Sequence, residues 1–417
     1  MGVQPGRYRS GYALRTAPEP YGGYSLKAVR RSVNRPSFLA IILLSWLLVG
    51  CTMVDNVSWP GLVTDGQYAY VSYGPGIVAY DVETRQTSWV YAPQPGAINF
   101  FAAPSVANGR LIVGDYGAPG GFINPSVTVT IYALSNGSQP EPTLLWTEQD
   151  LATDRIVAPA LQVGNQVYIG TADNQLLALN AETGDLIWQF RTGHSVWGSP
   201  TYKDVSFFST SLERQVDGVL FVTSLDRSVY ALEAETGDLL WQRTLGGAIA
   251  SQAVVNEGLV YVSSFARGVH ALSVETGEEQ WLAPADDWVW GAPALDNGVL
   301  YFASAQGDVH AVDAETGAEL WRQEILGAIQ TTPVVHGDML YIASERRGEN
   351  GGGLLTALSL SENGRQVWQN NTPEPLYTTP AVVGDSVVVA LQSDSALLIG
   401  FNQETGVQQW ILPPPEL

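Results

Sequence analysis

An eleven-residue string recurs along the chain and constrains the fold more than any other feature. It reads ALNAETGDLIW at 178–188 and returns 53 residues later as ALEAETGDLLW at 231–241. Close copies also occupy 271–281, 311–321 and 400–410, and weaker copies occupy 79–89, 133–146 and 357–368. All eight copies end in a tryptophan: Trp89, Trp146, Trp188, Trp241, Trp281, Trp321, Trp368 and Trp410. These tryptophans are 40 to 57 residues apart, which indicates eight repeats of one structural unit.

The content of one unit predicts its secondary structure. Residues 290–321 read WGAPALDNGVLYFASAQGDVHAVDAETGAELW, in which short alternating runs are separated by turn signals at Gly298, Gly307 and Gly317. This pattern predicts four short antiparallel strands per unit, and no stretch of helical period is long enough for a helical repeat. Eight such units predict an all-β fold, an eight-bladed β-propeller with four-stranded antiparallel blades.

The repeated string resembles the tryptophan-docking repeat of the PQQ-type β-propellers, and the resemblance covers nearly all of 57–412. It implies that the motif is architectural: each tryptophan packs between neighbouring blades, and a glycine allows a left-handed turn between the third and fourth strands. The glycines are Gly184, Gly237, Gly277, Gly317 and Gly406. The eight tryptophans and these glycines are therefore predicted to be blade-docking residues and not catalytic ones.

The first fifty residues are predicted to be a leader plus a lipoprotein signal peptide. A basic stretch from Lys27 to Arg35 precedes an apolar run at 38–50, which ends in LVG directly before Cys51. This ending resembles the bacterial lipobox, which implies that Cys51 is lipidated and anchors the protein in a membrane. Residues 51–57 would be a lipidated tether, and 58–417 a single propeller domain. An uncleaved signal anchor stays open as an alternative.

Charge and cysteine content narrow the function classes. From Cys51 onward there are 13 basic and 40 acidic residues, a net charge of −27 that disfavours nucleic acid as a partner. The single cysteine excludes an intrachain disulfide and, with four scattered histidines, a Cys/His zinc cluster. His270 and His310 occupy the same repeat position, which favours a packed strand. No catalytic residue, metal site or cofactor is predicted.

One further pattern suggests a binding site. Each unit has a Pro, or an equivalent residue, at the start of its first strand. Three residues before this position, five of the eight units carry an aromatic residue: Trp59, Phe101, Trp197, Trp290 and Tyr377. First strands of a propeller line its channel, so these side chains would form a rim at one mouth. Such a rim would bind an extended peptide or an apolar ligand. Asp286 and Asp287 would favour neutral or basic ligands, whereas packing between blades is the competing interpretation.

Insertions relative to the repeat fall at about 115–127, 203–216 and 345–353 and are predicted to be loops that project from the scaffold. The lipobox, the eight units and the missing catalytic set resemble the BamB-like lipoproteins, which assist β-barrel insertion into outer membranes.

The resemblance implies a non-enzymatic, lipid-anchored and monomeric propeller with a protein partner in the cell envelope. Its location would be the periplasmic face of the outer membrane in a Gram-negative source, and otherwise the outer face of the cytoplasmic membrane. An envelope-surface module that binds a ligand or peptide is one alternative. A PQQ-dependent dehydrogenase with PQQ and Ca²⁺ is another, although the vicinal cysteine pair of those enzymes is missing.

Overall fold

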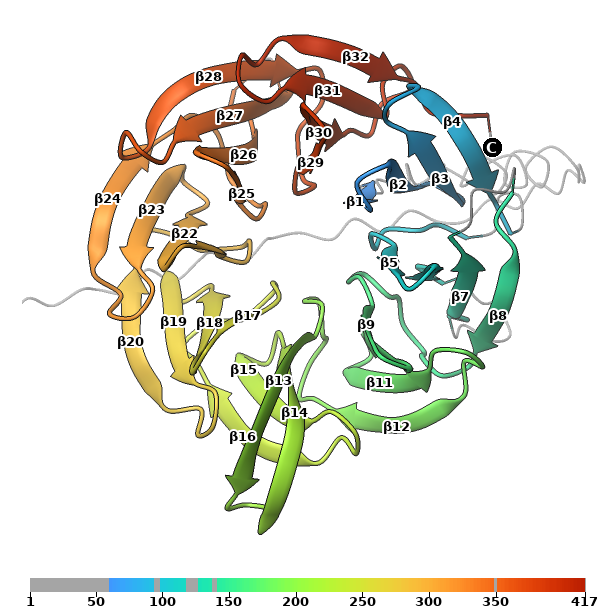
Figure 1. Ribbon diagram of the computed structural model, residues 1–417, viewed down its shortest axis with the longest axis vertical. Helices are drawn as coiled ribbons and strands as arrows, with labels where there is room; N and C mark the ends of the chain where they lie inside the picture. Colours follow the sequence, from blue (N-terminus) through green and yellow to red (C-terminus); the bar gives the residue numbers. More distant parts are fainter. Residues whose placement is uncertain (1–59, 94–97, 118–126, 137–140, 349–350, 417) are drawn as a thin grey trace, which may run out of the picture. The chain divides into compact units, whose positions relative to one another are not determined.

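The computed structural model describes residues 60–416, apart from 94–97, 118–126, 137–140 and 349–350. These residues form 32 strands and no helix, in eight sheets of four sequence-consecutive strands. The sheets lie in a ring as the blades of a β-propeller, which confirms the predicted fold (Figure 1). The described part of the chain has no helix with the length and hydropathy needed to cross a bilayer. The predicted leader, Cys51, the tether and Trp59 lie outside the described residues.

The first four blades are each built from one continuous stretch of chain. Blade 1 holds β1 (Gly61–Thr64), β2 (Tyr68–Tyr73), β3 (Gly76–Asp81) and β4 (Gln86–Tyr91). Blade 2 holds β5 (Ser105–Ala107), β6 (Arg110–Gly114), β7 (Thr130–Ser135) and β8 (Leu144–Gln149). Blade 3 holds β9 (Leu161–Val163), β10 (Gln166–Gly170), β11 (Gln175–Asn180) and β12 (Leu186–Arg191). Blade 4 holds β13 (Thr201–Ser209), β14 (Arg214–Thr223), β15 (Ser228–Glu233) and β16 (Leu239–Thr244).

The last four blades follow the same order. Blade 5 holds β17 (Val254–Asn256), β18 (Leu259–Ser264), β19 (Gly268–Ser273) and β20 (Glu279–Pro284). Blade 6 holds β21 (Ala294–Asp296), β22 (Val299–Ala303), β23 (Asp308–Asp313) and β24 (Glu319–Glu324). Blade 7 holds β25 (Val334–His336), β26 (Met339–Glu345), β27 (Gly353–Ser359) and β28 (Arg365–Thr372). Blade 8 holds β29 (Ala381–Val383), β30 (Ser386–Ala390), β31 (Leu398–Asn402) and β32 (Gln408–Leu412).

The hydrophobic core lies between neighbouring blades. Successive residues of a strand point to opposite faces of its sheet, so one strand contributes to two cores. In β11, Leu177 packs with Ile131 of blade 2, whereas the next residue, Ala178, packs with Leu220 and Leu232 of blade 4. The third strands, such as β11 and β23, are therefore buried along almost their whole length, and the blades are joined by burial of both sheet faces.

The repeated string holds neighbouring blades together through each of its parts. In blade 3, Trp188 pairs with the small residue Ala178, and the strand register shifts at this point. Its indole nitrogen donates a hydrogen bond to the carbonyl oxygen of Ala234 in blade 4, at 3.2 Å. Gly237 of blade 4 lies against the same indole and has a φ of 77°. Gly364 makes the equivalent contact with Trp321, although its weaker copy of the string hid it from sequence analysis.

The ring closes between blades 8 and 1 without a shared strand. The Tyr80 hydroxyl donates a hydrogen bond to the carbonyl oxygen of Pro413 at 2.9 Å, and the Thr378 hydroxyl donates one to that of Pro60 at 2.6 Å. Val78 of blade 1 and Val388 of blade 8 belong to one buried cluster. The closure therefore depends on side-chain packing and a few hydrogen bonds between the two ends of the propeller.

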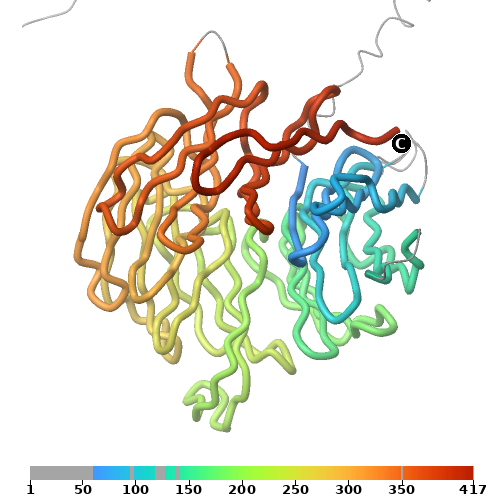
Figure 2. The backbone as a smooth tube through the Cα atoms, turned by 45° about the horizontal axis from the view of Figure 1, so that its top comes forward, coloured from blue at the N-terminus to red at the C-terminus, as the bar shows by residue number. Residues whose placement is uncertain are grey.

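The insertion at 203–216 is not the predicted loop. It lengthens β13 and β14 into a hairpin that stays paired as far as Ser209 and Arg214. The hairpin extends beyond the other blades in two views of the molecule (Figures 1 and 2). Likewise, β26 continues to Glu345 and β27 begins at Gly353, so the insertion at 345–353 partly extends a strand pair. Of the third predicted loop, residues 118–126 lie outside the described chain.

Candidate functional site

The four rim positions that the structure describes lie in the loops that lead from one blade to the next, directly before the first strands and not within them: Phe101, Trp197, Trp290 and Tyr377. Two cavities at the centre of the ring are lined by these loops. One has a volume of about 360 Å³ and reaches Gln330 and Tyr377, and the other has about 330 Å³ and reaches Phe101. Both are lined by Val157, Trp197, Ala250 and Trp290. The structure thus brings together side chains from blades 2 to 8 at one mouth of the channel.

Small residues beside the rim position allow the loops to approach one another closely. A β-carbon added at Gly198 would lie 2.5 Å from the carbonyl oxygen of Ser251, so the backbones are in contact there. The Thr223 hydroxyl donates a hydrogen bond to that same oxygen at 2.6 Å. Because the loop backbone is fixed by these contacts, the neighbouring Trp197 is held rigidly at the cavity wall.

The tryptophans of this site are partly open to solvent. Trp197 exposes 38% of its surface, and Trp290 is partly exposed, so neither is used up by packing between blades. Trp288 exposes 50% and stacks on Phe265, with 5.4 Å between the ring centroids. Phe265 also lies 5.0 Å from the ring of Trp290. Sequence analysis missed Phe265 and Trp288, although the Trp-Val-Trp sequence at 288–290 was a visible signal.

A stack of aromatic and cationic groups forms another wall of the smaller cavity. The ring centroids of Phe101 and Tyr116 are 4.0 Å apart, and the guanidinium carbon of Arg155 lies 4.6 Å from the Tyr116 ring centroid. Arg155 donates hydrogen bonds to the Tyr116 hydroxyl and, at 3.0 Å, to Asp154. Burial lowers the pKa of Arg155, but these hydrogen bonds outweigh it and raise the pKa overall. The cavity therefore offers flat apolar surfaces beside one permanent positive charge.

Asp286 and Asp287 do not line either central cavity. Asp286 instead forms an ion pair with Arg322, which also donates a hydrogen bond to Asp308 at 2.7 Å. The selectivity for neutral or basic ligands predicted from these acids therefore has no counterpart among the residues lining the cavities. Tyr377 does line the larger cavity, where burial and the nearby charge of Glu345 raise its pKa.

The described residues contain no group of three or more His, Cys, Asp or Glu side chains that could hold a metal ion. His310 is buried in β23, where its ring stacks on Phe302 with 4.8 Å between centroids. His270 is buried at the equivalent position of β19, so both histidines belong to packed strands.

Comparison with solved structures places the fold among known propellers. The BamB structure from Moraxella catarrhalis superposes with a TM-score of 0.58 at 17% identity, covering 84% of this chain and 93% of that one. The computationally designed Ika8 protein gives a TM-score of 0.64 at 15% identity, covering 85% and 96%. The quinohemoprotein alcohol dehydrogenase ADHIIG from Pseudomonas putida HK5 gives 0.53 at 14% identity, covering 72% and 62%. These likenesses concern the fold.

Sequence comparison adds two short matches and one long one. The quinoprotein alcohol dehydrogenase PedH of Pseudomonas putida is 54% identical over 37 residues, 9% of this chain and 6% of that protein. The quinoprotein ethanol dehydrogenase of Pseudomonas putida is 30% identical over 113 residues, 24% of this chain and 18% of that protein. The matched segments thus span less than a fifth of either dehydrogenase. By contrast, one family model matches residues 52–190, 128–216, 190–287 and 267–414. The chain therefore belongs to the family of the outer membrane protein assembly factor BamB.

Proposed function

We propose that this protein is a non-enzymatic, lipid-anchored propeller of the bacterial cell envelope that binds a protein partner at the channel mouth. Its proposed role is BamB-like, in the assembly of outer-membrane β-barrel proteins. The family match along 52–414 supports the role, and the run of apolar residues before Cys51 supports the anchor. The role and the anchor are separate hypotheses and are tested separately.

One observation carries the proposed binding site: aromatic side chains from several blades gather at one cavity and stay partly exposed. Trp197 and Trp290 line both central cavities, and the stacked pair of Phe101 and Tyr116 lines one of them. Exposed aromatic residues on a rigid support are the usual anchors of protein interfaces, because they bury a large area at little entropic cost. A partner segment would place apolar side chains between these rings.

Photo-crosslinking in the native membrane tests the proposed partner site. A photoreactive phenylalanine analogue at Trp197 or Trp290 should crosslink to a β-barrel assembly protein, identified by mass spectrometry. The same analogue at Thr183 is the control, since Thr183 is exposed in the turn between β11 and β12. Equal crosslinking from Thr183 and Trp197, or none from Trp197 and Trp290, would contradict the proposed site.

The anchor has its own test. Replacing Cys51 with Ser should move the protein from the membrane fraction to the soluble fraction and abolish incorporation of labelled palmitate. An unchanged membrane fraction with no label in the wild type would favour the uncleaved signal anchor. This outcome leaves the channel-mouth site to be judged by crosslinking alone.

An enzymatic alternative is favoured only by the short matches to quinoprotein dehydrogenases. Those matches cover 9% and 24% of this chain, whereas the family match runs along 52–414. A dye-linked dehydrogenase assay with added PQQ and Ca²⁺ checks this alternative, and we expect no turnover above the rate without protein. Saturable turnover that Trp197→Ala removes would overturn the non-enzymatic assignment.

A further inference from the structure

The hairpin of blade 4 is an ordered element that the repeat does not require. A register shift in β13 between Lys203 and Ser206 lies opposite Gly218, which has a φ of 80°. Such a bulge bends a strand pair, and here the paired strands leave the blade at this point. β13 begins four residues after Trp197 and runs away from it, so the hairpin lies at the far end of this strand from the rim position.

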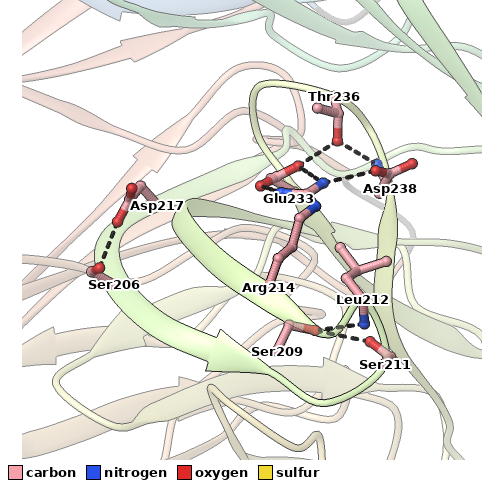
Figure 3. Close-up of polar contacts among 9 residues, drawn as sticks. All are labelled: Ser206, Ser209, Ser211, Leu212, Arg214, Asp217, Glu233, Thr236 and Asp238. Carbon is pink, nitrogen blue, oxygen red and sulfur yellow. Dashed lines mark hydrogen bonds and ion pairs between the residues drawn. The ribbon is translucent and has the colours of Figure 1, made fainter.

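The hairpin is fixed to its own blade by a network of charged and polar side chains. Arg214 donates hydrogen bonds to both carboxylate oxygens of Glu233 and, at 2.9 Å, to Asp238 (Figure 3). Glu233 is buried and also accepts a hydrogen bond from the Thr236 hydroxyl. The Ser211 hydroxyl, at the tip, donates to the carbonyl oxygen of Leu240 at 3.0 Å. These contacts keep the hairpin in one conformation.

This network explains a departure within the repeated string. In other copies, Asn180, Asp313 and Asn402 accept hydrogen bonds from backbone N–H groups of their own turn. Blade 4 has Glu233 at that position, and its carboxylate receives Arg214 of the hairpin instead. The residue that caps the turn in the other copies therefore binds the hairpin in blade 4.

One face of the hairpin is packed and the other is open. Val205, Phe207 and Leu212 pack against the core cluster between blades 4 and 5, whereas Phe208 exposes 61% of its surface. Ser206 lies on the same open face and donates a hydrogen bond to Asp217 of β14. An exposed phenylalanine on a fixed strand is an apolar contact that the fold itself does not use.

The outer edge of β13 is unpaired. Among the residues that the structure describes, the backbone of Ser206 to Phe208 pairs with β14 alone. Natural edge strands are usually protected by charged residues such as lysine, by proline or by β-bulges. Here the eight residues Val205 to Leu212, VSFFSTSL, carry no charge and no proline. Beyond the bulge, this part of the edge has neither charge nor proline to protect it and is suited to accept another strand.

We infer that the edge of β13 around Ser206 and Phe208 is a docking site for an extended strand of a partner protein. The partner strand would add to β13 through backbone hydrogen bonds and place an aromatic or β-branched side chain against Phe208. Exposed Asp204 and Glu213 near the two ends of the site favour Lys or Arg in the partner. A second copy is the less suitable occupant, because two chains that each carry a net charge of −27 over residues 51–417 repel each other and so short an edge buries little area.

Fluorescence anisotropy with a synthetic peptide tests this inference on the full chain in detergent. The probe is a labelled, blocked ten-residue peptide that alternates Lys with Tyr and Thr. Two control peptides carry N-methyl groups on alternate residues, one for each register, so that one of them loses the N–H donors facing β13. We expect saturable binding of the parent peptide and loss of binding by one control. Equal binding of all three peptides would show only charge attraction and would overturn the inference.

Matched protein variants locate the site. Ser206→Lys protects the edge and repels the peptide, so binding should weaken more than tenfold, whereas Ser395→Lys makes the same charge change on blade 8 and should have less than a twofold effect. Phe208→Ser should weaken binding about two- to fivefold. Leu326→Ser is its control, since Leu326 is 69% exposed on a loop between blades 6 and 7. Equal effects within either pair would overturn the proposed site.

Two further measurements keep the result interpretable. Near-ultraviolet circular dichroism shows whether Ser206→Lys keeps its fold. If it does not, the comparison of Phe208→Ser with Leu326→Ser decides whether the peptide binds at the edge of β13. Analytical sedimentation of the wild type without peptide measures its oligomeric state and so tests whether a second copy occupies the edge. A dimer that Phe208→Ser dissociates would overturn the inference in favour of a second copy. These outcomes are independent of crosslinking at Trp197, so the two sites stand or fall separately.

Discussion

Gly237 of blade 4 lies directly against the indole of Trp188 in blade 3. A β-carbon added at Gly237 would lie 2.6 Å from Cε3 and 2.7 Å from Cδ2 of that ring. Its φ of 77° is also in the left-handed region, which side chains rarely adopt. The glycine is therefore required twice, once by the turn and once by the tryptophan of the preceding blade.

Replacing Gly237 with Ala should lower the free energy of unfolding by about 2–4 kcal/mol, through left-handed strain and overpacking against Trp188. Gly258→Ala is the control, because no atom lies within 4 Å of an added β-carbon there and its φ is not positive. Urea denaturation of both variants measures the difference. Equal stabilities would contradict the requirement for a glycine at 237.

Removing the tryptophan from the same contact should also weaken the interface between blades 3 and 4. Trp188→Ala should cost about 3–5 kcal/mol, since it leaves a cavity between two blades. Trp288→Ala is the comparison, because Trp288 is 50% exposed and its loss should cost less than about 1.5 kcal/mol. Thermal and urea unfolding would measure both, and an unchanged stability of Trp188→Ala would contradict the docking role.

The repeat made the propeller predictable, because each unit must provide the same turn and the same tryptophan contact. Ala178, Asn180 and Gly184 each have a fixed place in that contact. The hairpin was not predictable in this way, since 203–216 is an insertion with no counterpart in the other units. Its sequence also lacks Gly, Asn and Pro, the residues that usually mark a hairpin turn.

The channel mouth was predictable only in part. Trp197 and Trp290 share a repeat position, so alignment of the units identified them together. Tyr116 and Arg155 come from loops that do not follow the repeat, and their contact depends on how blades 2 and 3 sit in the ring. Asp286 was assigned to the rim from its closeness in sequence to Trp290, but it forms an ion pair with Arg322 of β24, the fourth strand of blade 6, and lines neither cavity.

The attachment of the hairpin should make stability depend on pH through Glu233. The hydrogen bond from Arg214 is the main cause that lowers the pKa of this carboxyl below its ordinary value of 4.5. A lowered folded pKa stabilises the native state above the unfolded pKa, and this contribution is lost as the pH falls through the folded pKa. At pH 7, Glu233→Gln should cost about 1–3 kcal/mol, because it removes a charge-assisted hydrogen bond.

Urea denaturation at several pH values between 3 and 7 measures the pH-dependent contribution of Glu233 to stability. The difference between wild type and Glu233→Gln should shrink as the pH falls below about 4.5. Glu235→Gln, two residues away and exposed, should match the wild type throughout. A difference between wild type and Glu233→Gln that stays constant with pH would show that the carboxylate charge is not what holds the hairpin.

His310 should make the stability of the fold depend on pH in a higher range than Glu233 does. Burial lowers the pKa of this imidazole from its ordinary value of 6.5, and the nearby charge of Arg322 adds to this effect. The carboxylate of Glu319, 3.3 Å from Nδ1, and that of Asp308 oppose it. Below pH 6.5 the unfolded chain binds a proton that the folded chain does not, so stability falls as the pH decreases toward the folded pKa.

Replacing His310 with Leu, the residue at the equivalent position 177, should remove this loss. The unfolding free energy of His310→Leu should therefore fall less than that of wild type between pH 7 and 5, whereas the exposed His336→Leu should fall as wild type does. Parallel pH profiles for all three proteins would show that His310 takes up its proton as readily in the folded chain as in the unfolded one.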